Sequence, residues 1–598
     1  MATTLIATIE IEAPLLTKSS APGEAGLDAI MARNAKNEAV LHDRHIKGKL
    51  RDAWRELAAD LKVPVDDWLG YAGANRQNSS GDFRPRTGLI QVKDFTGPVI
   101  GETDPRIRIQ IDSERRAAQE HMLQMIESPF DSGDRLVFRG VIECEDGVDV
   151  QFAMRAITAG LYWAGTCGGM RTSGFGRIVS VNLKVDGKPR ATVLTDSGTD
   201  RLWVWLTTSD SVCVTESRAM DNLYVSGQTL PGGVIKGALA STWLRALGKE
   251  GLVRADSDST KPQLSAHFDK IRFSHGRVTR KDRTASLALV PPLSIGRTGT
   301  SYRDFALCSD IHADGTEAVT FEPDWKISDR LAMGRRFGSE HMPTELRVRT
   351  AIDPTKRRAA DSQLFAWQVI VPKEEQGWTS CIDCGAVPEQ DRATVRSQLL
   401  SLLSRPIRYV GKTKATLNVE LLEYKPTQSI DRADVYVLTL QTPALLGNPD
   451  SLTEAHSGDV LLKAYAADFA TMSNGALKLV RFFAKQYLQG GMYLYKHFLD
   501  GGDYPYQPYL LTQPGSVFVM EPAGDRKDKA VECIREWARF GLPAAPWSAE
   551  RYRRGGLPGD HWSNHPYLRE NGFGEIAVNL SCHWEEHLEI PEENGGAR

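Results

Sequence analysis

Short segments of this sequence recur in the same order, and internal repetition constrains a fold more strongly than any other feature of a sequence. The segment IKGKLRDAW at residues 46–54 matches IKGALASTW at residues 235–243, with Ile, Lys, Gly, Leu and Trp at equivalent places. The segment RIRIQIDSERRAA at 106–118 matches RVRTAIDPTKRRAA at 347–360, which has one extra residue. Two matches in the same order are hard to attribute to chance, so the sequence predicts repeated structural units.

A third match concerns glycine-rich turns. SGFGRIVSVNL at 173–183 resembles NGFGEIAVNL at 571–580, and Gly411 stands at the corresponding place between them. These three turns each precede an expected final strand. We therefore expect three units, at residues 1–190, 198–428 and 430–590.

Each expected unit mixes strands and helices. Alternating β-branched and aromatic residues near residues 5, 201 and 434 predict a first strand, and the IKG segments then run into helical spacing. Later strands are expected at 134–144, 364–372 and 516–522, each followed by a helix. This order predicts an α+β protein of tandem β-α-β-β-α-β, ferredoxin-like (RRM-like) units with long insertions.

Composition excludes several classes of protein. The 598 residues carry 73 basic and 76 acidic side chains, a net charge of −3, which argues against coating nucleic acid with the whole surface but leaves room for a basic groove. Eight dispersed cysteines suggest a reducing compartment, and the N-terminus has no basic region before an apolar run. We expect a cytoplasmic protein with no membrane span.

This combination of an initial strand, an IKG helix, an R-x-R-x-x-I-D segment and a closing glycine-rich turn resembles the repeat-associated "RAMP" proteins of CRISPR–Cas effector complexes. The first unit is similar to the backbone subunits of type III effectors, which line the guide RNA. The second and third units together resemble the cap-type RAMP that holds the 5′ tag of the guide, especially the larger form of type III-D systems. The third unit lacks a clear IKG helix, and the second lacks the GFG turn.

The resemblance implies an RNA-binding subunit of an antiviral ribonucleoprotein. Its implied partners are the CRISPR guide RNA, complementary target RNA and other type III effector subunits. Those subunits are further backbone RAMPs, a large polymerase/cyclase-like subunit and a small helical subunit. Rival interpretations are a structural guide holder without nuclease activity, a guide-processing endoribonuclease, and a scaffold that binds other proteins.

Several residues fit RNA binding by their chemistry. Glycine-rich turns let backbone N–H groups approach a polyanion, and neighbouring side chains add donors. The two IKG lysines are expected just before a helix, and the paired arginines share a strand face. Alternatives are tight turns, solvated lysines and an ordinary surface strand. The predicted RNA-binding residues are Lys47, Arg106, Arg108, Gly168, Gly169, Arg171, Thr172, Ser173, Gly174, Gly176, Lys236, Arg347, Arg349, Gly572 and Gly574.

Asp28 is the catalytic candidate, because cutting members of the family carry an aspartate between the first strand and the IKG-type helix. A carboxylate near the scissile phosphodiester could hold Mg²⁺ or another divalent cation, or assist deprotonation of the RNA 2′-OH. Asp43, beside His42 and His45, is the next choice. The alternative for Asp28 is a loop or cap residue.

Two further groups of residues carry weaker signals. Cys381 and Cys384 could form a zinc site with Cys308 and His312. On a strand, however, the two cysteine side chains of a C-x-x-C motif point to opposite faces, so structural zinc is not expected there. An insertion in the second unit is rich in basic residues near Phe268 and Phe273, which would allow base stacking. Its basic residues are Lys270, Arg272, Arg277, Arg280, Lys281 and Arg283.

Overall fold

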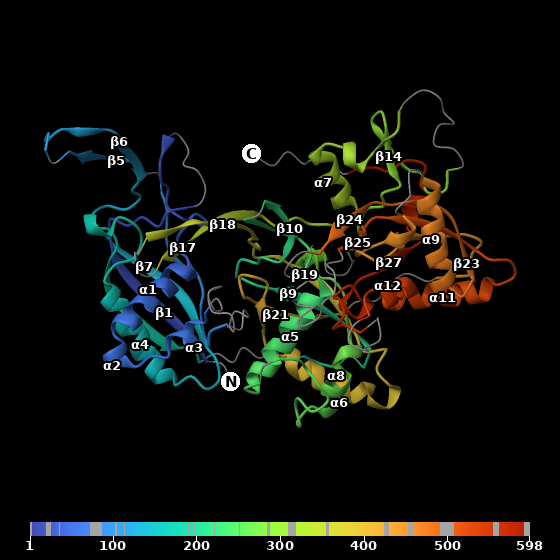
Figure 1. Ribbon diagram of the computed structural model, residues 1–598, viewed down its shortest axis with the longest axis horizontal. Helices are drawn as coiled ribbons and strands as arrows, with labels where there is room; N and C mark the ends of the chain where they lie inside the picture. Colours follow the sequence, from blue (N-terminus) through green and yellow to red (C-terminus); the bar gives the residue numbers. More distant parts are fainter. Residues whose placement is uncertain are drawn as a thin grey trace.

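The computed structural model describes residues 3–19, 26–34, 36–71, 87–101, 105–112, 114–187, 192, 194–196, 198–220, 222–249, 251–283, 288–308, 318–353, 358–423, 430–452, 458–490, 508–553 and 561–590. These residues form a mixed α+β structure of several largely antiparallel sheets (Figure 1), which confirms the predicted class. No helix among them is both long and apolar enough to cross a membrane.

The N-terminal sheet has the strand order β2-β4-β7-β1-β8, and β3 also pairs with β7. Helix α1 follows the first strand, and α4 lies between β7 and β8. Buried Ile46, Leu50 and Trp54 recur at four-residue steps on α1, and Trp54 Nε1 donates to the carbonyl of Ala156 on α4 at 2.8 Å. The elements are β1 (Thr3–Glu12), β2 (Glu38–Leu41), α1 (Asp43–Glu56), α2 (Ala58–Leu61), α3 (Val65–Leu69), β3 (Ile90–Val92), β4 (Phe95–Val99), β7 (Arg135–Cys144), α4 (Val150–Ala164) and β8 (Arg177–Val185).

The middle sheet has the order β12-β19-β9-β21-β20, with β13 also paired to β19. Its first strand is buried along its length, as expected for a strand covered on both faces. The elements are β9 (Arg201–Thr207), α5 (Gly232–Ala246), α6 (Pro262–His267), β12 (Arg272–Phe273), β13 (Arg277–Arg280), β19 (Gln376–Asp383), α8 (Glu389–Leu403), β20 (Ile407–Val410) and β21 (Ala415–Leu422).

The C-terminal sheet has the order β23-β26-β22-β27. Helix α9 follows the first strand, and α11 follows the third. The elements are β22 (Tyr436–Leu440), α9 (Gly458–Met472), β23 (Leu477–Phe483), β26 (Val517–Pro522), α11 (Lys527–Phe540), α12 (Pro546–Arg551) and β27 (Ile576–Val578).

One strand order recurs in all three sheets. Four strands of each sheet share this order: β4-β7-β1-β8, β12-β19-β9-β21 and β23-β26-β22-β27. Counted along the chain within each set of four, the first strand lies between the third and the fourth. The second strand lies at the edge, beside the third. Each sheet has its own hydrophobic core. The cores draw on residues 5–178, 202–419 and 436–578.

A β-hairpin stands between the second and third strands of each unit. The hairpins pair β5 (Pro105–Ile111) with β6 (Ala118–Glu127), β17 (Thr344–Asp353) with β18 (Arg358–Ile370), and β24 (Gln486–Gln489) with β25 (Tyr509–Thr512). Both R-x-R segments therefore lie on the first strand of equivalent hairpins, as the repeat predicts.

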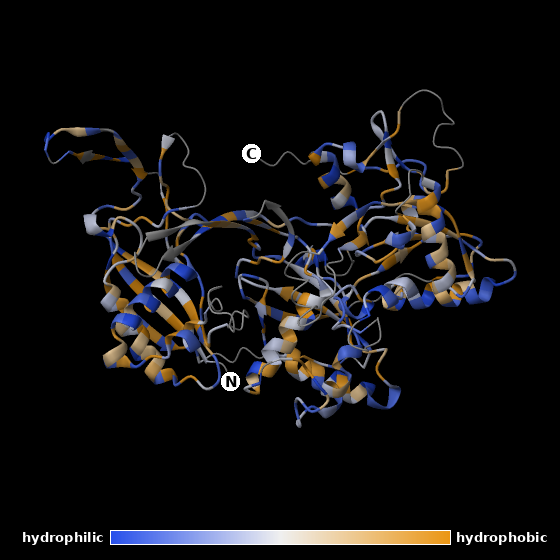
Figure 2. Cartoon of the chain, viewed as in Figure 1, coloured by the Kyte–Doolittle hydropathy of each residue, from blue (hydrophilic) through white to orange (hydrophobic). Residues whose placement is uncertain are grey.

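The first two hairpins differ in their surroundings. The β5–β6 hairpin projects from the molecule, and apolar and polar residues are mixed along it (Figures 1 and 2), with Ile107, Ile109 and Leu123 more than half exposed. The β17–β18 hairpin instead extends toward the N-terminal sheet (Figure 1). It belongs to a four-stranded sheet with β10 (Thr215–Met220) and β11 (Leu223–Ser226).

A smaller insertion completes the structure. It contains β14 (Ile295–Thr298), β15 (Ser301–Asp304), β16 (Thr320–Phe321) and α7 (Ile327–Arg336). These elements pack against the end of the chain through a small core that includes Tyr302, Cys582 and Leu588.

Candidate nucleic-acid interface

The glycine-rich turn of the N-terminal unit is packed against the segment that follows β1. A Cβ on Gly176 would lie 1.9 Å from the carbonyl oxygen of Cys167, and one on Gly168 would lie 2.7 Å from that of Leu16. Both glycines also have positive φ, so a side chain is excluded there on two grounds.

The backbone N–H groups of this turn are already used within the protein. Gly168 donates to His45 Nε2 at 2.8 Å, Gly169 to the carbonyl of Leu16 at 2.8 Å, and Gly176 to that of Pro14 at 2.7 Å. Gly174 donates to the carbonyl of Arg171 at 3.2 Å. The prediction that these glycine N–H groups bind phosphate is therefore wrong, because they are hydrogen-bonded to the segment that follows β1, to His45 and within the turn itself.

Several side chains of the same turn are exposed to solvent and could contact RNA. Arg171, Thr172 and Ser173 form an exposed 3₁₀ turn. Arg108 on β5 reaches this turn, where its guanidinium donates to Ser173 Oγ at 2.8 Å, and the guanidinium of Arg106 lies over the ring of Phe175. The structure thus brings two separately predicted motifs together, and they present exposed cations beside hydroxyl groups.

His45 on α1 supports this turn and does not act as a free base. Burial, reinforced by the nearby charge of Lys49, lowers the pKa of His45 to about 4. Its Nε2 atom is already an acceptor for the Gly168 N–H. The histidine is therefore neutral at pH 7 and holds the turn against α1.

A second group of cations lies on another face of α1, next to the middle unit. Burial and the positive charges of Arg51 and Arg44 lower the pKa of Lys47 to about 8, and Lys414 of the middle unit acts in the same direction. In the described part of the chain, no carboxylate lies within 4.0 Å of the charged groups of Arg44, Lys47 or Lys414. Clustered cations without salt bridges are typical of a site for a polyanion.

Sequence inspection did not identify Arg44 or Lys414 as members of this group. Lys414 follows Gly411 in the turn that corresponds to the glycine-rich turn of the first unit. The sequence feature that could have indicated Lys414 is the segment GKTK, with lysines at 412 and 414. The structure also places Lys47 inside the second turn of α1 and not ahead of the helix, since α1 begins at Asp43.

Lys236, the repeat partner of Lys47, has a different environment. Its side chain is buried, and Nζ donates at 2.8 Å to the carbonyl oxygens of both Asp269 and Ile271. Phe268 and Phe273 also surround the ammonium. The predicted phosphate contact is wrong for Lys236, because tertiary packing encloses the group that would make it.

Lys236→Met tests this assignment. Burial lowers the pKa of Lys236 to about 8 in the folded protein, below the value of about 10.4 for an unfolded chain. The cost of burying the charge is thus present below pH 8 and disappears as pH rises toward 10.4. We expect the stability of the wild type relative to Lys236→Met to increase from pH 7 to pH 10 in urea titrations. A pH-independent difference would contradict the buried, titrating lysine.

Arg347 and Arg349 join the middle unit to the N-terminal unit. Arg347 forms an ion pair with Asp94 at 3.0 Å, and its side chain is 11% exposed. The guanidinium of Arg349 lies 4.1 Å from the ring centroid of Trp367, which also contacts that of Arg44 at 4.7 Å. The predicted RNA contact is wrong for Arg347, because a carboxylate from the other unit neutralises it.

A cavity of about 590 Å³ lies at this junction, lined by residues of both units that include Arg33, His42, Asp43, Asp210 and Arg349. Burial and the neighbouring charge of Asp94 raise the pKa of Asp43. Burial alone would raise the pKa of Asp94, but the nearby imidazole of His42, the charge of Arg347 and the hydrogen bond from the Asp43 N–H outweigh it and lower the pKa. The junction therefore places two carboxyl groups close together whose pKa values are shifted in opposite directions.

The C-terminal glycine-rich turn lies inside the protein. A Cβ on Gly572 would lie 2.5 Å from the carbonyl oxygen of Phe273, and the N–H of Gly574 donates to the carbonyl of Pro443 at 2.9 Å. Both glycines are buried. The predicted RNA contacts are wrong for Gly572 and Gly574, because the middle unit covers Gly572 and the C-terminal unit itself covers Gly574.

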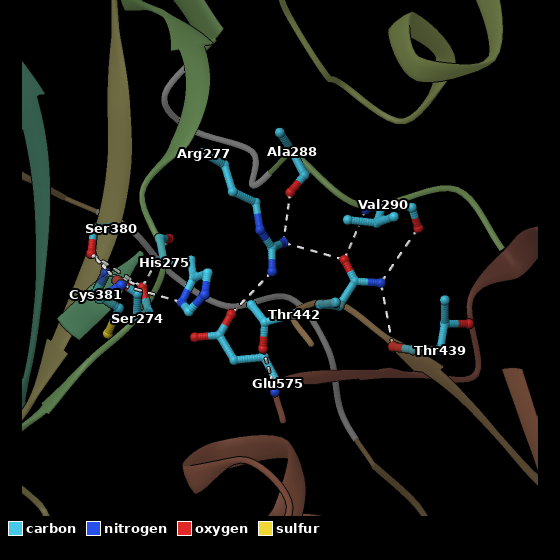
Figure 3. A network of polar contacts seen from close by, with 12 residues as sticks. Ser274, His275, Arg277, Ala288, Val290, Ser380, Cys381, Thr439, Thr442 and Glu575 are labelled. Carbon is cyan, nitrogen blue, oxygen red and sulfur yellow. Dashed lines mark hydrogen bonds and ion pairs between the residues drawn. The ribbon is translucent and has the colours of Figure 1, made fainter. Parts of the chain in front are cut away.

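The residue that follows this turn, Glu575, neutralises two arginines of the basic insertion. Glu575 forms ion pairs with Arg272 at 2.7 Å and with Arg277 at 3.0 Å. Figure 3 shows Arg277 pointing at Glu575, while its guanidinium also donates to the carbonyl of Ala288. Both arginines are buried, so they join the middle and C-terminal units and do not offer a surface to RNA.

Asp28 lies at the base of the β5–β6 hairpin. Its carboxylate accepts a hydrogen bond from the backbone N–H of Met125 at 2.7 Å, and the residue is exposed. Met125 pairs with Ile107, so Asp28 stands two strand spacings, about 10 Å, from the strand that carries Arg108.

Mg²⁺ sites usually combine carboxylates with water and phosphate oxygens. Within the described ranges, the single group of three potential ligands that lie close enough together for one ion does not include Asp28. A divalent cation at Asp28 stays a prediction.

The proposed zinc ligands of the middle unit are dispersed. Cys381 lies on β19 and Cys384 just after it, and burial raises their thiol pKa values to about 11 and 12. Cys308 lies just after β15, and His312 is outside the described residues.

Comparisons with known proteins give matches only among solved structures. No family model matches the sequence, and no curated protein matches it. One similar structure is a chain in the cryo-EM structure of the type III-B Cmr-beta bound to cognate target RNA. It has 12% sequence identity, a TM-score of 0.22, and coverage of 30% of this chain and 61% of the other. This chain therefore spans about three fifths of the length of that relative.

A second similar chain comes from the cryo-EM structure of the type III-B Cmr-beta bound to cognate target RNA and AMPPnP, state 1. It also has 12% identity, with a TM-score of 0.25 and coverage of 53% of this chain and 86% of the other.

Proposed function

We propose that this chain is a guide-RNA-binding subunit of a type III CRISPR effector ribonucleoprotein. In this proposal, residues 1–190 form a backbone-type RAMP unit, and residues 198–428 and 430–590 form a cap-type RAMP of two ferredoxin-like units. The recurring strand order, the three separate cores and the repeated IKG and R-x-R-x-x-I-D segments support that division.

The observation that carries the proposal is the cation group at the junction of the first two units. Arg44, Lys47 and Lys414 come from two repeats, and no salt bridge within 4.0 Å neutralises them in the described part of the chain, although the charge of nearby Asp43 acts on Arg44 and Lys47. The exposed Arg171 and Arg106 extend the positive surface around α1. Such cations contact phosphates and position an RNA strand, while base pairing to the guide selects the target.

The middle and C-terminal units hold the 5′ tag in this proposal. Their buried ion pairs through Glu575 fix the two units to each other, which would give the tag a rigid support. The remaining partners are complementary target RNA and the other effector subunits that the sequence motifs imply.

Asp28 is proposed to assist cleavage of the paired target RNA. Its carboxylate takes the proton of a ribose 2′-OH, and the oxygen attacks the adjacent phosphorus. The bond to the 5′ oxygen of the next nucleotide breaks, which gives a cyclic phosphate and a 5′-OH after protonation from water. The exposure of Asp28 near the basic turn supports this role.

A non-catalytic guide holder is the second candidate, and one observation favours it. One oxygen of Asp28 already accepts the Met125 N–H, as a purely structural loop residue would. A guide-processing enzyme would need a histidine base, and the ring nitrogen of His45 that faces the turn is occupied by Gly168.

Lys47→Ala tests the cation group. For a phosphate contact, the slope of log affinity against log salt concentration should fall in magnitude by about one unit. Because the pKa of Lys47 is about 8 without RNA, wild-type affinity should also decline as pH rises through 8, and this decline should be weaker in Lys47→Ala. Filter binding with a guide RNA over a grid of salt and pH measures both effects.

Lys236→Met is the matched control, since the same motif places its lysine in a closed core. Its salt slope should equal that of the wild type. An unchanged slope in Lys47→Ala would remove this lysine from the RNA surface.

A further inference from the structure

Three side chains with metal-binding atoms meet in a buried position far from the cation group. Asp304 ends β15, and Cys582 and His583 lie in the 3₁₀ turn η8 (Ser581–His583) near the end of the described chain. Their oxygen, sulfur and nitrogen atoms all lie within 4.8 Å of one another, and all three residues are buried. They form the one such group in the ranges that the structure describes.

The histidine points a polar atom into this group without a hydrogen bond. His583 Nδ1 lies 3.1 Å from Asp304 Oδ1, but the pair lacks hydrogen-bond geometry, and the side chains of both residues are 0% exposed. The other ring nitrogen, Nε2, lies 3.2 Å from Thr439 Oγ1 on β22. If Nε2 carries the proton and donates to Thr439, the lone pair on Nδ1 faces a carboxylate oxygen of Asp304, and the two repel each other. A cation bound between them would remove this repulsion.

The arrangement has the features of a ligated site. A metal-binding histidine usually donates its second ring N–H to a neighbouring acceptor, as His583 can to Thr439. Asp304 is itself oriented, because Ser294 Oγ donates to its Oδ2 at 2.7 Å and the Ala306 N–H donates to its Oδ1 at 2.8 Å. Cys582 lies in an apolar core with Tyr302 and Leu588, where few other groups could satisfy a thiolate.

We propose that Asp304, Cys582 and His583 bind one zinc ion that fastens the end of the chain to the β14–β15 insertion. Zinc bonds of about 2.0–2.3 Å to oxygen, nitrogen and sulfur suit this mixed set after a small contraction. Water would supply a fourth ligand, because the group contains only these three side chains. The site is independent of the proposed RNA function.

Zinc would give the buried carboxylate of Asp304 a counter-charge. The ion would connect the insertion, the C-terminal turn and, through Thr439, the first strand of the C-terminal sheet.

The test uses the full-length protein. Elemental analysis of metal after gel filtration should give about one zinc per chain, which should fall at least fivefold in Cys582→Ser and in Asp304→Asn. Cys533→Ser, which changes a cysteine outside the group, should retain it. Replacement of zinc by Co²⁺ in the wild type should produce a thiolate-to-cobalt charge-transfer band, and a chelator should lower the thermal midpoint.

The cobalt spectrum keeps the proposal falsifiable even if the variants fail to fold, since it needs only the wild type. Wild-type protein that holds no stoichiometric zinc and gives no thiolate–cobalt band would overturn the proposal. Zinc retained at full occupancy in folded Cys582→Ser would also overturn it, because the ion would then lie elsewhere. In either case Asp304 and His583 would be an ordinary buried pair of a carboxylate and an imidazole.

Discussion

Asp28→Ala lowers the rate of target-RNA cleavage by about a hundredfold or more, if its carboxylate is the base that the proposed reaction needs. Guide content should hardly change, because a carboxylate adds no attraction for phosphate. The measurement is cleavage of a matched RNA by the assembled complex, with products resolved to single nucleotides. The cut set by this subunit should disappear while cuts set by other subunits persist.

Asp28→Asn separates chemistry from structure at the same position. The amide oxygen can still accept the hydrogen bond from the Met125 N–H, but the amide cannot take a proton. We therefore expect Asn to be as inactive as Ala, with an unchanged thermal midpoint. Asp112→Ala removes another exposed carboxylate from the same hairpin and should cleave normally. Wild-type cleavage in Asp28→Asn would make Asp28 a loop residue and favour the non-catalytic guide holder.

Glu575→Ala should destabilise the junction of the middle and C-terminal units by about 3–5 kcal/mol, because it leaves buried cations without their partner. Arg272, Arg277 and Glu575 are all at least 86% buried at their side chains. Neither guanidinium can turn to water without opening the interface. Denaturant titration followed by tryptophan fluorescence, together with limited proteolysis between the units, would measure the loss.

Asp282→Ala provides the surface counterpart. Its ion pair with Arg280 is about half exposed on both sides, so its removal should cost less than about 1 kcal/mol. The double variant Arg272→Met, Glu575→Met would distinguish lost pairing from lost packing. Equal small effects in Glu575→Ala and Asp282→Ala would show that solvent reaches the buried network.

The repeated motifs predicted which residues occupy equivalent positions in the repeated units, but they could not predict what surrounds each side chain. The IKG segments place Lys47 and Lys236 at the same turn of equivalent helices. Lys47 lies near one cation of the next unit, Lys414, whereas Lys236 is enclosed by Phe268, Phe273 and two carbonyl oxygens. That difference arises from residues more than thirty positions away, which no local pattern contains.

The R-x-R-x-x-I-D segments show the same limit. Both lie on the first strand of a hairpin, yet Arg108 contacts the turn of its own unit while Arg347 pairs with Asp94 of another. The sequence predicted that the glycine-rich turns bind phosphate, and the alternative was a tight turn before a final strand. Only three-dimensional packing reveals that their N–H groups are already bonded.

The ion pair between Asp94 and Arg347 has a consequence for synthesis on the ribosome. Asp94 and Asp43 emerge early, but Arg347 follows about 250 residues later, which at about 5–20 residues per second is roughly 10–50 s. Throughout that interval the nascent N-terminal unit carries two adjacent carboxylates without their counter-charge. Its surface toward the middle unit therefore stays open and hydrated until translation delivers the second hairpin, which sets the order in which the units can join.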